Sequence, residues 1–153
     1  FAHVEGWQWR PDMIWYDNLR SFKSCSYYVQ QLYSIYKGTN VLPLKMNGKV
    51  VAGDEDQNGL FASSVLDKNT GDIYVKVVNV SDKAQDVKVT LKGLKGVTSA
   101  KMVSLSSSDP IAENTLDNPN KIKPVEQTVQ MTGKNVLETK VPASTFAIYV
   151  ISK

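Results

Sequence analysis

A short segment near the N-terminus gathers the residue types best suited to hold a sugar. Trp7, Trp9, Arg10 and Asp12 lie within six residues of one another. An indole face packs on the apolar face of a sugar ring, while neighbouring polar side chains form hydrogen bonds with its hydroxyl groups. Tryptophan pairs also serve as core residues, so packing at a junction between two parts of the fold is the alternative. The segment therefore predicts either a carbohydrate-binding loop or a buried junction.

The carboxylates do not form a pair suited to hydrolysing a glycosidic bond. Such hydrolysis uses a general acid and a nucleophile, about 5 Å apart in retaining enzymes. Glu5 is the one carboxylate at a predicted strand end beside aromatic residues, whereas Glu113, Asp117 and Glu126 lie in or beside a loop without an aromatic platform. His3 is the only histidine, which excludes a Ser/His/Asp set and leaves the single cysteine without an activating imidazole. On chemistry alone, no catalytic residue is predicted and the chain is not a complete enzyme.

Two further patterns resemble metal-binding sites, but each lacks ligands that the site would need. His3 and Glu5 would share one face of a strand, but no second histidine or cysteine stands ready to join them. Residues 54–59 copy the start of a calcium loop, with oxygen donors at positions 1, 3 and 5 and Gly59 at position 6. Position 12 is Val65 where that loop needs a bidentate carboxylate, so a polar hairpin turn is the better interpretation. The sequence predicts no metal and no cofactor.

Composition describes an ordinary globular chain. Its 153 residues are 42% hydrophobic and 22% charged, with a net charge of +3. The lysines alternate with apolar residues instead of forming a patch, which argues against nucleic acid as a partner. No apolar run approaches the roughly 18 residues of a membrane helix. The chain opens on Phe1 without an initiator Met or a signal peptide, so we expect an excised segment of a longer protein.

The chain divides into two segments that differ in amino-acid composition, and each segment predicts different secondary structure. Residues 1 to about 38 contain all three tryptophans and five of the seven tyrosines. Here we expect a buried strand at 1–4, a loop through Asp12, and a helix from about 26 to 37 that carries an apolar stripe. Ser24 or Ser26 would cap this helix and Gly38 would end it. Strand, loop and helix make half of a βα unit, which cannot be stable alone.

Residues 41–153 alternate apolar and polar side chains with period two, which is typical of antiparallel strands. The predicted strands are 42–46, 49–53, 59–67, 72–79, 87–91, 98–104, 126–132, 135–141 and 146–151. The last of these is apolar on both faces, so both should be covered. Turn residues such as Asn47-Gly48 separate the strands, and residues 106–125 are expected to form a long ordered loop. So many short strands predict a mainly β protein built as an antiparallel β-sandwich.

The chain also resembles a known family along most of its length. Its first forty residues, which include Glu5-Gly6-Trp7-Gln8-Trp9-Arg10-Pro11-Asp12, are similar to the end of the catalytic barrel in glycoside hydrolase family 51, the α-L-arabinofuranosidases. The similar segments are residues 3–19, 26–33, 37–39, 112–119 and 141–144.

The resemblance implies a retaining enzyme that removes terminal arabinofuranosyl groups from arabinose-containing polysaccharides or oligosaccharides. It implies that residues 1–40 are the last strand, loop and helix of a (β/α)8 barrel, and that 41–153 are a jelly-roll-like β-sandwich in contact with that barrel. Active sites of such barrels lie at the C-terminal ends of the strands. Trp7, Trp9 and Asp12 are therefore the expected substrate contacts, and the catalytic glutamates are expected upstream.

A periplasmic or extracellular location suits a polysaccharide-degrading parent, while the oligomeric state stays open. The competing hypothesis makes the sandwich a non-catalytic carbohydrate-binding module. Such a module usually presents a row of aromatic side chains, and residues 41–153 contain no tryptophan. Tyr74, Tyr149, Phe61 and Phe146 are better explained as core or cross-strand packing.

Overall fold

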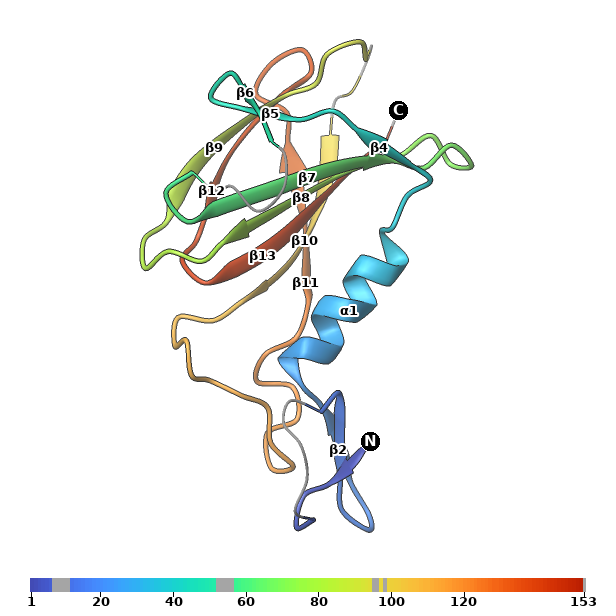
Figure 1. Cartoon of the computed structure of the whole chain (residues 1–153), viewed down its shortest axis with the longest axis vertical. Coiled ribbons are helices and arrows are strands. Elements are labelled where there is room, and N and C mark those ends of the chain that lie inside the picture. The colour runs from blue at the N-terminus through green and yellow to red at the C-terminus, as the bar shows by residue number, and fades with distance from the viewer. Residues whose placement is uncertain (7–11, 52–56, 95–96, 98, 153) are drawn as a thin grey trace.

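The computed structural model describes residues 1–6, 12–51, 57–94, 97 and 99–152. A six-stranded antiparallel sheet forms the body of the molecule, with a single helix over one face and a two-stranded sheet over the other. A small three-stranded sheet at the N-terminus lies beyond the helix, at the opposite end of the molecule from the β-sandwich (Figure 1). The elements are β1 Ala2–His3, β2 Ile14–Tyr16, β3 Ser21–Lys23, α1 Cys25–Ile35, β4 Asn40–Leu42, β5 Lys45–Met46, β6 Lys49–Val50, β7 Leu60–Leu66, β8 Ile73–Asn79, β9 Gln85–Thr90, β10 Ser99–Ser106, β11 Val125–Gln130, β12 Val136–Val141 and β13 Thr145–Ile151.

Strand β13 lies near the centre of the large sheet, whose order is β11-β10-β13-β8-β7-β4. It pairs antiparallel with β10 on one side and with β8 on the other. Ile148 and Tyr149 point to opposite faces, and each has an exposed fraction of 0%. The prediction that this strand is covered on both faces is confirmed.

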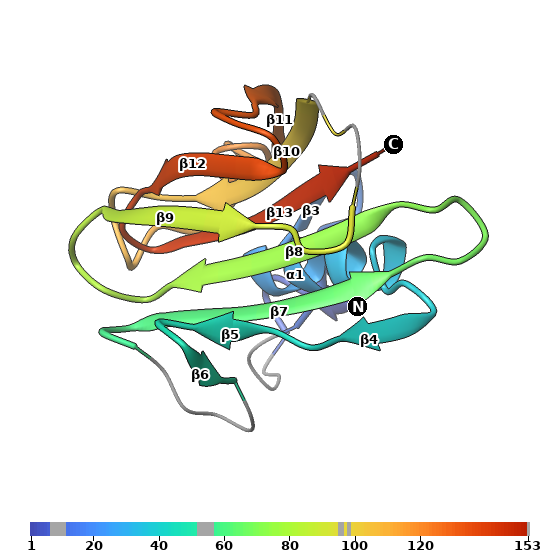
Figure 2. The same ribbon diagram turned by 90° about the horizontal axis from the view of Figure 1, so that it is seen from above.

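The two faces of the large sheet bury different side chains. Toward the two-stranded sheet β12-β9, visible in front of the large sheet in Figure 2, the core contains Val75, Val77, Met102, Leu137 and Tyr149. Toward α1, the core contains Leu32 of the helix with Tyr74, Val103, Phe146 and Ile148 of the sheet. Period-two alternation in the strands accounts for this division, because successive residues point to opposite faces.

Helix α1 begins at Ser24, whose side chain accepts a hydrogen bond from the backbone N–H of Tyr27 at 3.2 Å. One face of α1 then packs on the sheet through Leu32, with the Tyr33 ring stacked on Phe146 at 5.1 Å between ring centroids. The helix spans 25–35, close to the predicted 26–37. Gly38 follows in the left-handed region, with φ of 64°. The predicted helix is confirmed, and of the two proposed caps, Ser24 and Ser26, Ser24 is the one that caps it.

Turn chemistry also follows the sequence. Asn47-Gly48 and Asn58-Gly59 both have positive φ at each position, as a tight hairpin turn of the primed type requires. The predicted polar turn at 54–59 lies partly outside the described residues, but its Asn58-Gly59 end closes a bridge between Gln57 and Leu60. Residues 107–124 contain no strand, which confirms the predicted long loop.

Two local features differ from expectation. The hairpin β2–β3 was not predicted, because its strands have three residues each and the turn of residues 17–20 depends on the side chain of Asp17. The single strand predicted at 42–46 is divided into β4 and β5 at Pro43-Leu44, since proline cannot donate a ladder hydrogen bond. Among the described residues, no helix is long and apolar enough to cross a membrane.

Candidate functional site

A pocket of about 520 Å³ lies between the N-terminal unit, defined here as β1–β3 with their connections, and the long loop 107–124. The N-terminal unit contributes Val4, Asp12, Trp15 and Phe22 to its wall, and the start of α1 contributes Cys25. The long loop contributes residues 110–117, including Glu113. The pocket therefore joins two segments that lie about a hundred residues apart in the chain.

Asp12 is the predicted site residue that the structure places in this pocket; Trp7 and Trp9 lie outside the described residues. Its carboxylate oxygen Oδ2 is buried and has no hydrogen-bond partner in the part of the chain that is described. A buried carboxylate oxygen without a donor is costly, so it favours the arrival of a hydroxyl or another donor. Trp15 and Phe22 add aromatic surface beside it. This combination suits a ligand rich in hydroxyl groups.

Asn114 attaches the long loop to the N-terminal unit. Its side-chain amide donates to the backbone carbonyls of Lys23 at 2.9 Å and Ile122 at 2.8 Å, and its Oδ1 accepts from the backbone N–H of Ile122 at 2.7 Å. The residue has an exposed fraction of 1%. Tyr28, Leu105 and Ile122 pack together beside it as a small apolar cluster. The pocket wall is thus held by a buried polar network backed by a satellite core.

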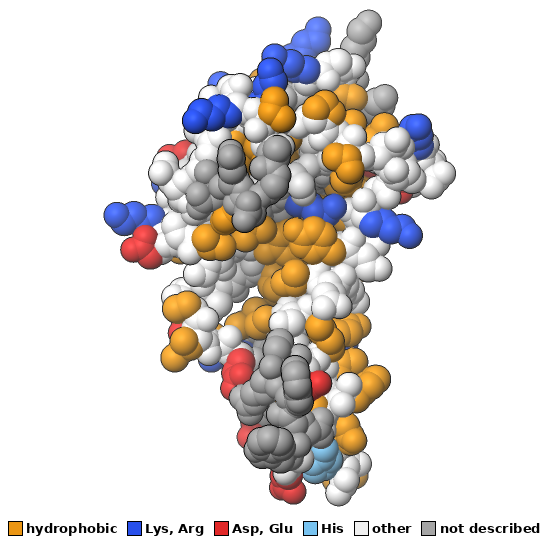
Figure 3. All heavy atoms as spheres, in the orientation of Figure 1, with side chains coloured by type: hydrophobic (Ala, Val, Ile, Leu, Met, Phe, Trp, Pro, Cys, Tyr) orange, Lys and Arg blue, Asp and Glu red, His pale blue; other side chains and the backbone are white. Residues whose placement is uncertain are grey.

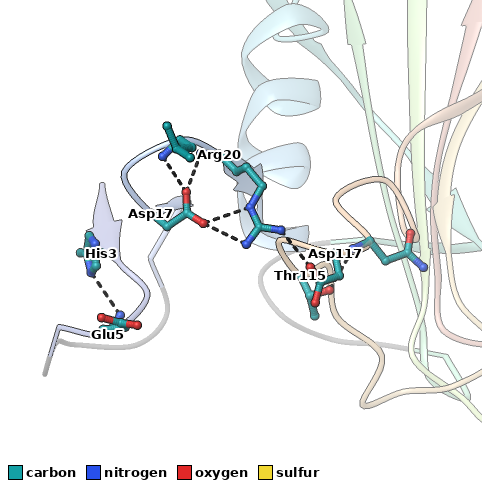
Figure 4. Close-up of polar contacts among 8 residues, drawn as sticks. His3, Glu5, Asp17, Arg20, Thr115 and Asp117 are labelled. Carbon is teal, nitrogen blue, oxygen red and sulfur yellow. Dashed lines mark hydrogen bonds and ion pairs between the residues drawn. The ribbon is translucent and has the colours of Figure 1, made fainter.

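Arg20 makes a second connection between the same two segments (Figure 4). Its guanidinium lies 3.0 Å from an Asp17 carboxylate oxygen and 2.9 Å from an Asp117 oxygen across the junction. The backbone N–H groups of Leu19 and Arg20 also donate to Asp17, at 2.8 and 2.5 Å. These N–H groups are the main cause that lowers the pKa of Asp17, and the Arg20 side chain adds to the effect. The ion pair between Arg20 and Asp117 connects the long loop to the N-terminal unit.

The remaining reactive groups near the pocket do not form a nucleophilic site. Burial raises the pKa of the Cys25 thiol, and the charge of Glu113 raises it further, so the thiol stays protonated at neutral pH. His3 accepts a hydrogen bond at Nδ1 from the backbone N–H of Glu5 at 3.2 Å and packs edge-on against Tyr16. Within the described ranges, no three His, Cys, Asp or Glu side chains gather in a way that could hold a metal.

Sequence reasoning missed Trp15, Phe22 and Glu113 as pocket residues. The signal for the first two was faint, because Ile14–Tyr16 and Ser21–Lys23 are too short to show a period. Glu113 stands in a segment that resembles the family, but nothing local indicates that residues 112–119 face the N-terminal unit. The fold and pocket together define a class: a β-sandwich domain with a strand, hairpin and helix attached, and with a pocket at the junction between them.

Comparisons with known proteins agree with this class and make it specific. The model of the family described as "Alpha-L-arabinofuranosidase C-terminal domain" matches residues 1–144. The chain belongs to this family and corresponds to the C-terminal domain of glycoside hydrolase family 51 enzymes.

Similar sequences include Alpha-L-arabinofuranosidase A from Aspergillus niger, 34% identical over 131 residues that cover 83% of this chain and 18% of that protein. Alpha-L-arabinofuranosidase 2 from Arabidopsis thaliana is 28% identical over 153 residues, covering 97% of this chain and 22% of that protein. The chain thus spans about a fifth of the length of these relatives.

Solved structures share the fold. An arabinose-bound GH51 α-L-arabinofuranosidase superposes with a TM-score of 0.83 at 25% identity, covering 98% of this chain and 22% of the other. The GH51 arabinofuranosidase from Xanthomonas axonopodis pv. citri superposes over 92% of this chain and 28% of its own, with a TM-score of 0.77 at 22% identity. The antiparallel β-sandwich and the helix packed upon it are therefore features of the family fold.

Proposed function

We propose that this chain is the C-terminal part of a retaining α-L-arabinofuranosidase that removes terminal arabinofuranosyl groups from arabinose-containing polysaccharides or oligosaccharides. Membership of the family supports this, together with relatives that are named arabinofuranosidases and extend well beyond the matched segment. The acid and nucleophile glutamates belong to the upstream part of the parent. A parent that degrades polysaccharides works outside the cytoplasm, in the periplasm or the extracellular space.

Within that parent, residues 1–40 complete the catalytic barrel and residues 41–153 brace it. The packing of α1 supports this role, because Leu32 is 4% exposed and lies against the large sheet. The part of the parent that precedes β1 is then connected to the β-sandwich through α1. The loop contacts of Asn114 and Arg20 add a second connection. The chain acts as a buttress with a fixed orientation.

Trp7, Trp9 and Asp12 form part of the rim of the parent's substrate pocket. The observation that carries this role is the buried Oδ2 of Asp12 in the wall of the junction pocket, which has no hydrogen-bond partner among the residues that the structure describes. A sugar hydroxyl is a donor of suitable size and polarity for that oxygen. Asp12 holds substrate in this account and does not take part in the chemistry.

A free-standing carbohydrate-binding module is the weaker candidate. In the described part of the β-sandwich, Tyr74, Phe146 and Tyr149 are all at most 7% exposed. Phe61 is half-buried in the sheet face that carries α1. Tyr74, Phe146 and Tyr149 are used in core packing, and Phe61 alone cannot form a sugar-binding row.

The test is steady-state kinetics of the parent enzyme on an aryl α-L-arabinofuranoside and on arabinan. The parent should hydrolyse both, and Asp12→Asn should lower kcat/KM about tenfold through KM, as expected for losing one hydrogen bond to a charged acceptor. Asp82→Asn is the matched control, because Asp82 is exposed in the β8–β9 turn and should leave the kinetics unchanged. Unaltered kinetics in Asp12→Asn would remove the rim role while leaving the arabinofuranosidase assignment in place.

A further inference from the structure

Lys76 is buried in the large sheet without an anionic partner in the described part of the chain. Its exposed fraction is 4%, and its Nζ lies 5.3 Å from the centroid of the Tyr33 ring. Its cross-strand neighbours, Ser63 on β7 and Ile148 on β13, are uncharged. By contrast, the lysines in the described ion pairs, Lys88, Lys101 and Lys140, have side chains at least 46% exposed.

Burial of this kind is costly for an ammonium group. Desolvation lowers the pKa of Lys76, which shows that the surroundings disfavour its charged form. A cation–π contact with Tyr33 recovers only part of the lost hydration. Buried charges in folded proteins are ordinarily paired, and an unpaired one marks a missing contact. A carboxylate beside Lys76 would supply the anionic partner that its ammonium group lacks among the described residues.

Space for that group exists beside the lysine. A cavity of about 120 Å³ is lined by Lys76, Tyr33, Val51, Phe61 and Val78, with Ala62 and Ser63 completing the wall. Apart from Lys76 and Ser63 the cavity is bordered by apolar and aromatic side chains, so an arriving carboxylate would meet a single cation there. Figure 3 shows hydrophobic side chains gathered across the middle of the visible face, where the β-sandwich meets the helix.

We propose that this cavity receives an aspartate or glutamate side chain from the part of the parent protein that precedes Phe1, and that Lys76 pairs with it. The cavity lies on the α1 side of the large sheet, since Tyr33 of α1 lines it and Phe61, Lys76 and Val78 share the face that α1 covers. The N-terminal unit lies beyond α1, so preceding chain enters from the end of the molecule where β1 lies (Figure 1). About four fifths of each relative's length falls outside the matched segment, which provides ample chain to reach this face.

The ion pair would fix the register of the preceding part on the β-sandwich. Apolar packing alone is non-directional, whereas a single buried cation accepts one anion at one position. This inference relies on the proposed function only in that the chain has a longer parent. It does not depend on the reaction which that parent catalyses, so the two can fail separately.

The first test compares Lys76→Met in the 153-residue chain and in the parent protein by thermal unfolding. In the chain, methionine removes a desolvated charge, so Tm should rise by about 2–4 °C. In the parent, the same change leaves the partner carboxylate buried and unpaired, so Tm should fall by at least as much. Lys92→Met is the control, because Lys92 is exposed and should shift Tm little in either protein. A shift of the same sign in both proteins would overturn the proposal.

The second test follows the Lys76 side chain by NMR titration of its ¹³Cε resonance. Its pKa should lie below the ordinary Lys value in the chain and rise by about one unit or more in the parent. Excess acetate should leave the Lys76 resonance of the chain unchanged, whereas a selective response would mean that the cavity takes a free anion. Neutralising the carboxyl groups at 54, 55 and 56 should also leave it unchanged. A further fall in pKa on neutralisation would mean that this chain supplies the anion itself, contrary to the proposal.

Discussion

The buried side-chain amide of Asn114 donates to the backbone carbonyl of Lys23, which lies 91 residues away in the chain. Both its amide nitrogen and its amide oxygen form hydrogen bonds, and the two backbone groups of Ile122 that it contacts are buried. The asymmetry of hydrogen-bond energetics makes such a residue important, because removing it leaves several buried groups without partners. Its role was invisible in the sequence, where Asn114 is one of several polar residues in a loop.

Asn114→Ala should lower the free energy of unfolding by about 2–3 kcal/mol, since the Lys23 carbonyl and both backbone groups of Ile122 lose their partner. Urea denaturation of the chain measures this change. Asn120→Ala is the matched control, because Asn120 is exposed in the same loop and should cost less than about 0.5 kcal/mol. Equal effects from the two variants would show that the Asn114 network does not hold the loop.

Asp17 gives the junction a pH dependence whose sign follows from its lowered pKa. A carboxyl group with a folded-state pKa below its unfolded value stabilises the fold above the ordinary pKa of 3.8, and this contribution is lost as pH falls through the lowered value. Asp17→Asn should therefore flatten the stability profile below about pH 4.

NMR titration of the Asp17 carboxyl carbon checks the cause of the shift. Arg20→Gln should raise the pKa only part of the way, because the N–H groups of Leu19 and residue 20 still donate to the carboxylate. A complete return to 3.8 in this variant would mean that the Arg20 charge, and not the backbone, is the main cause.

Among the elements, α1 shows how much a period can predict. The sequence predicted an amphipathic helix from the apolar stripe Val29, Leu32, Tyr33 and Tyr36. Three of these residues pack in the core on the α1 side of the large sheet, and the partly exposed Tyr33 ring stacks on Phe146. The strands from β7 to β13 were predictable for the same reason, since alternation of apolar and polar side chains survives in the sequence. The hairpin β2–β3 was not predictable, because three-residue strands carry no period and depend on the Asp17 turn.

Leu32→Ala should destabilise the chain by about 2–5 kcal/mol, because it leaves a cavity between α1 and the large sheet where Leu32 is 4% exposed. Ile35→Ala is the control, because Ile35 lies at the exposed C-terminal end of the same helix with an exposed fraction of 58%, and it should change stability by about 0.5 kcal/mol or less. Denaturant midpoints of the two variants provide the measurement. If both cost the same, the helix does not pack on the sheet as described.

At the scale of the whole molecule, the sequence indicated the sandwich but not the pocket between the N-terminal unit and the long loop. Arg20 and Asp117, which connect the two sides, are 97 residues apart, and no local pattern predicts contacts at that separation. Asp12 was predicted from its neighbours, while Trp15 and Glu113 became visible as pocket residues only once the loop was placed against the N-terminal unit. The fold class can be predicted from the spacing of apolar residues along the chain, whereas the pocket depends on contacts between distant segments.

The central claim is that this chain supports hydrolysis without performing it. The most direct measurement is release of arabinose from an aryl α-L-arabinofuranoside by the purified 153-residue chain, with its folding verified by circular dichroism, beside the parent enzyme at equal molarity. The account predicts turnover by the parent and none above background by the folded chain, because we propose that the two opposed carboxyl groups that the reaction needs lie in the preceding part of the parent. Turnover by the folded chain alone would contradict it.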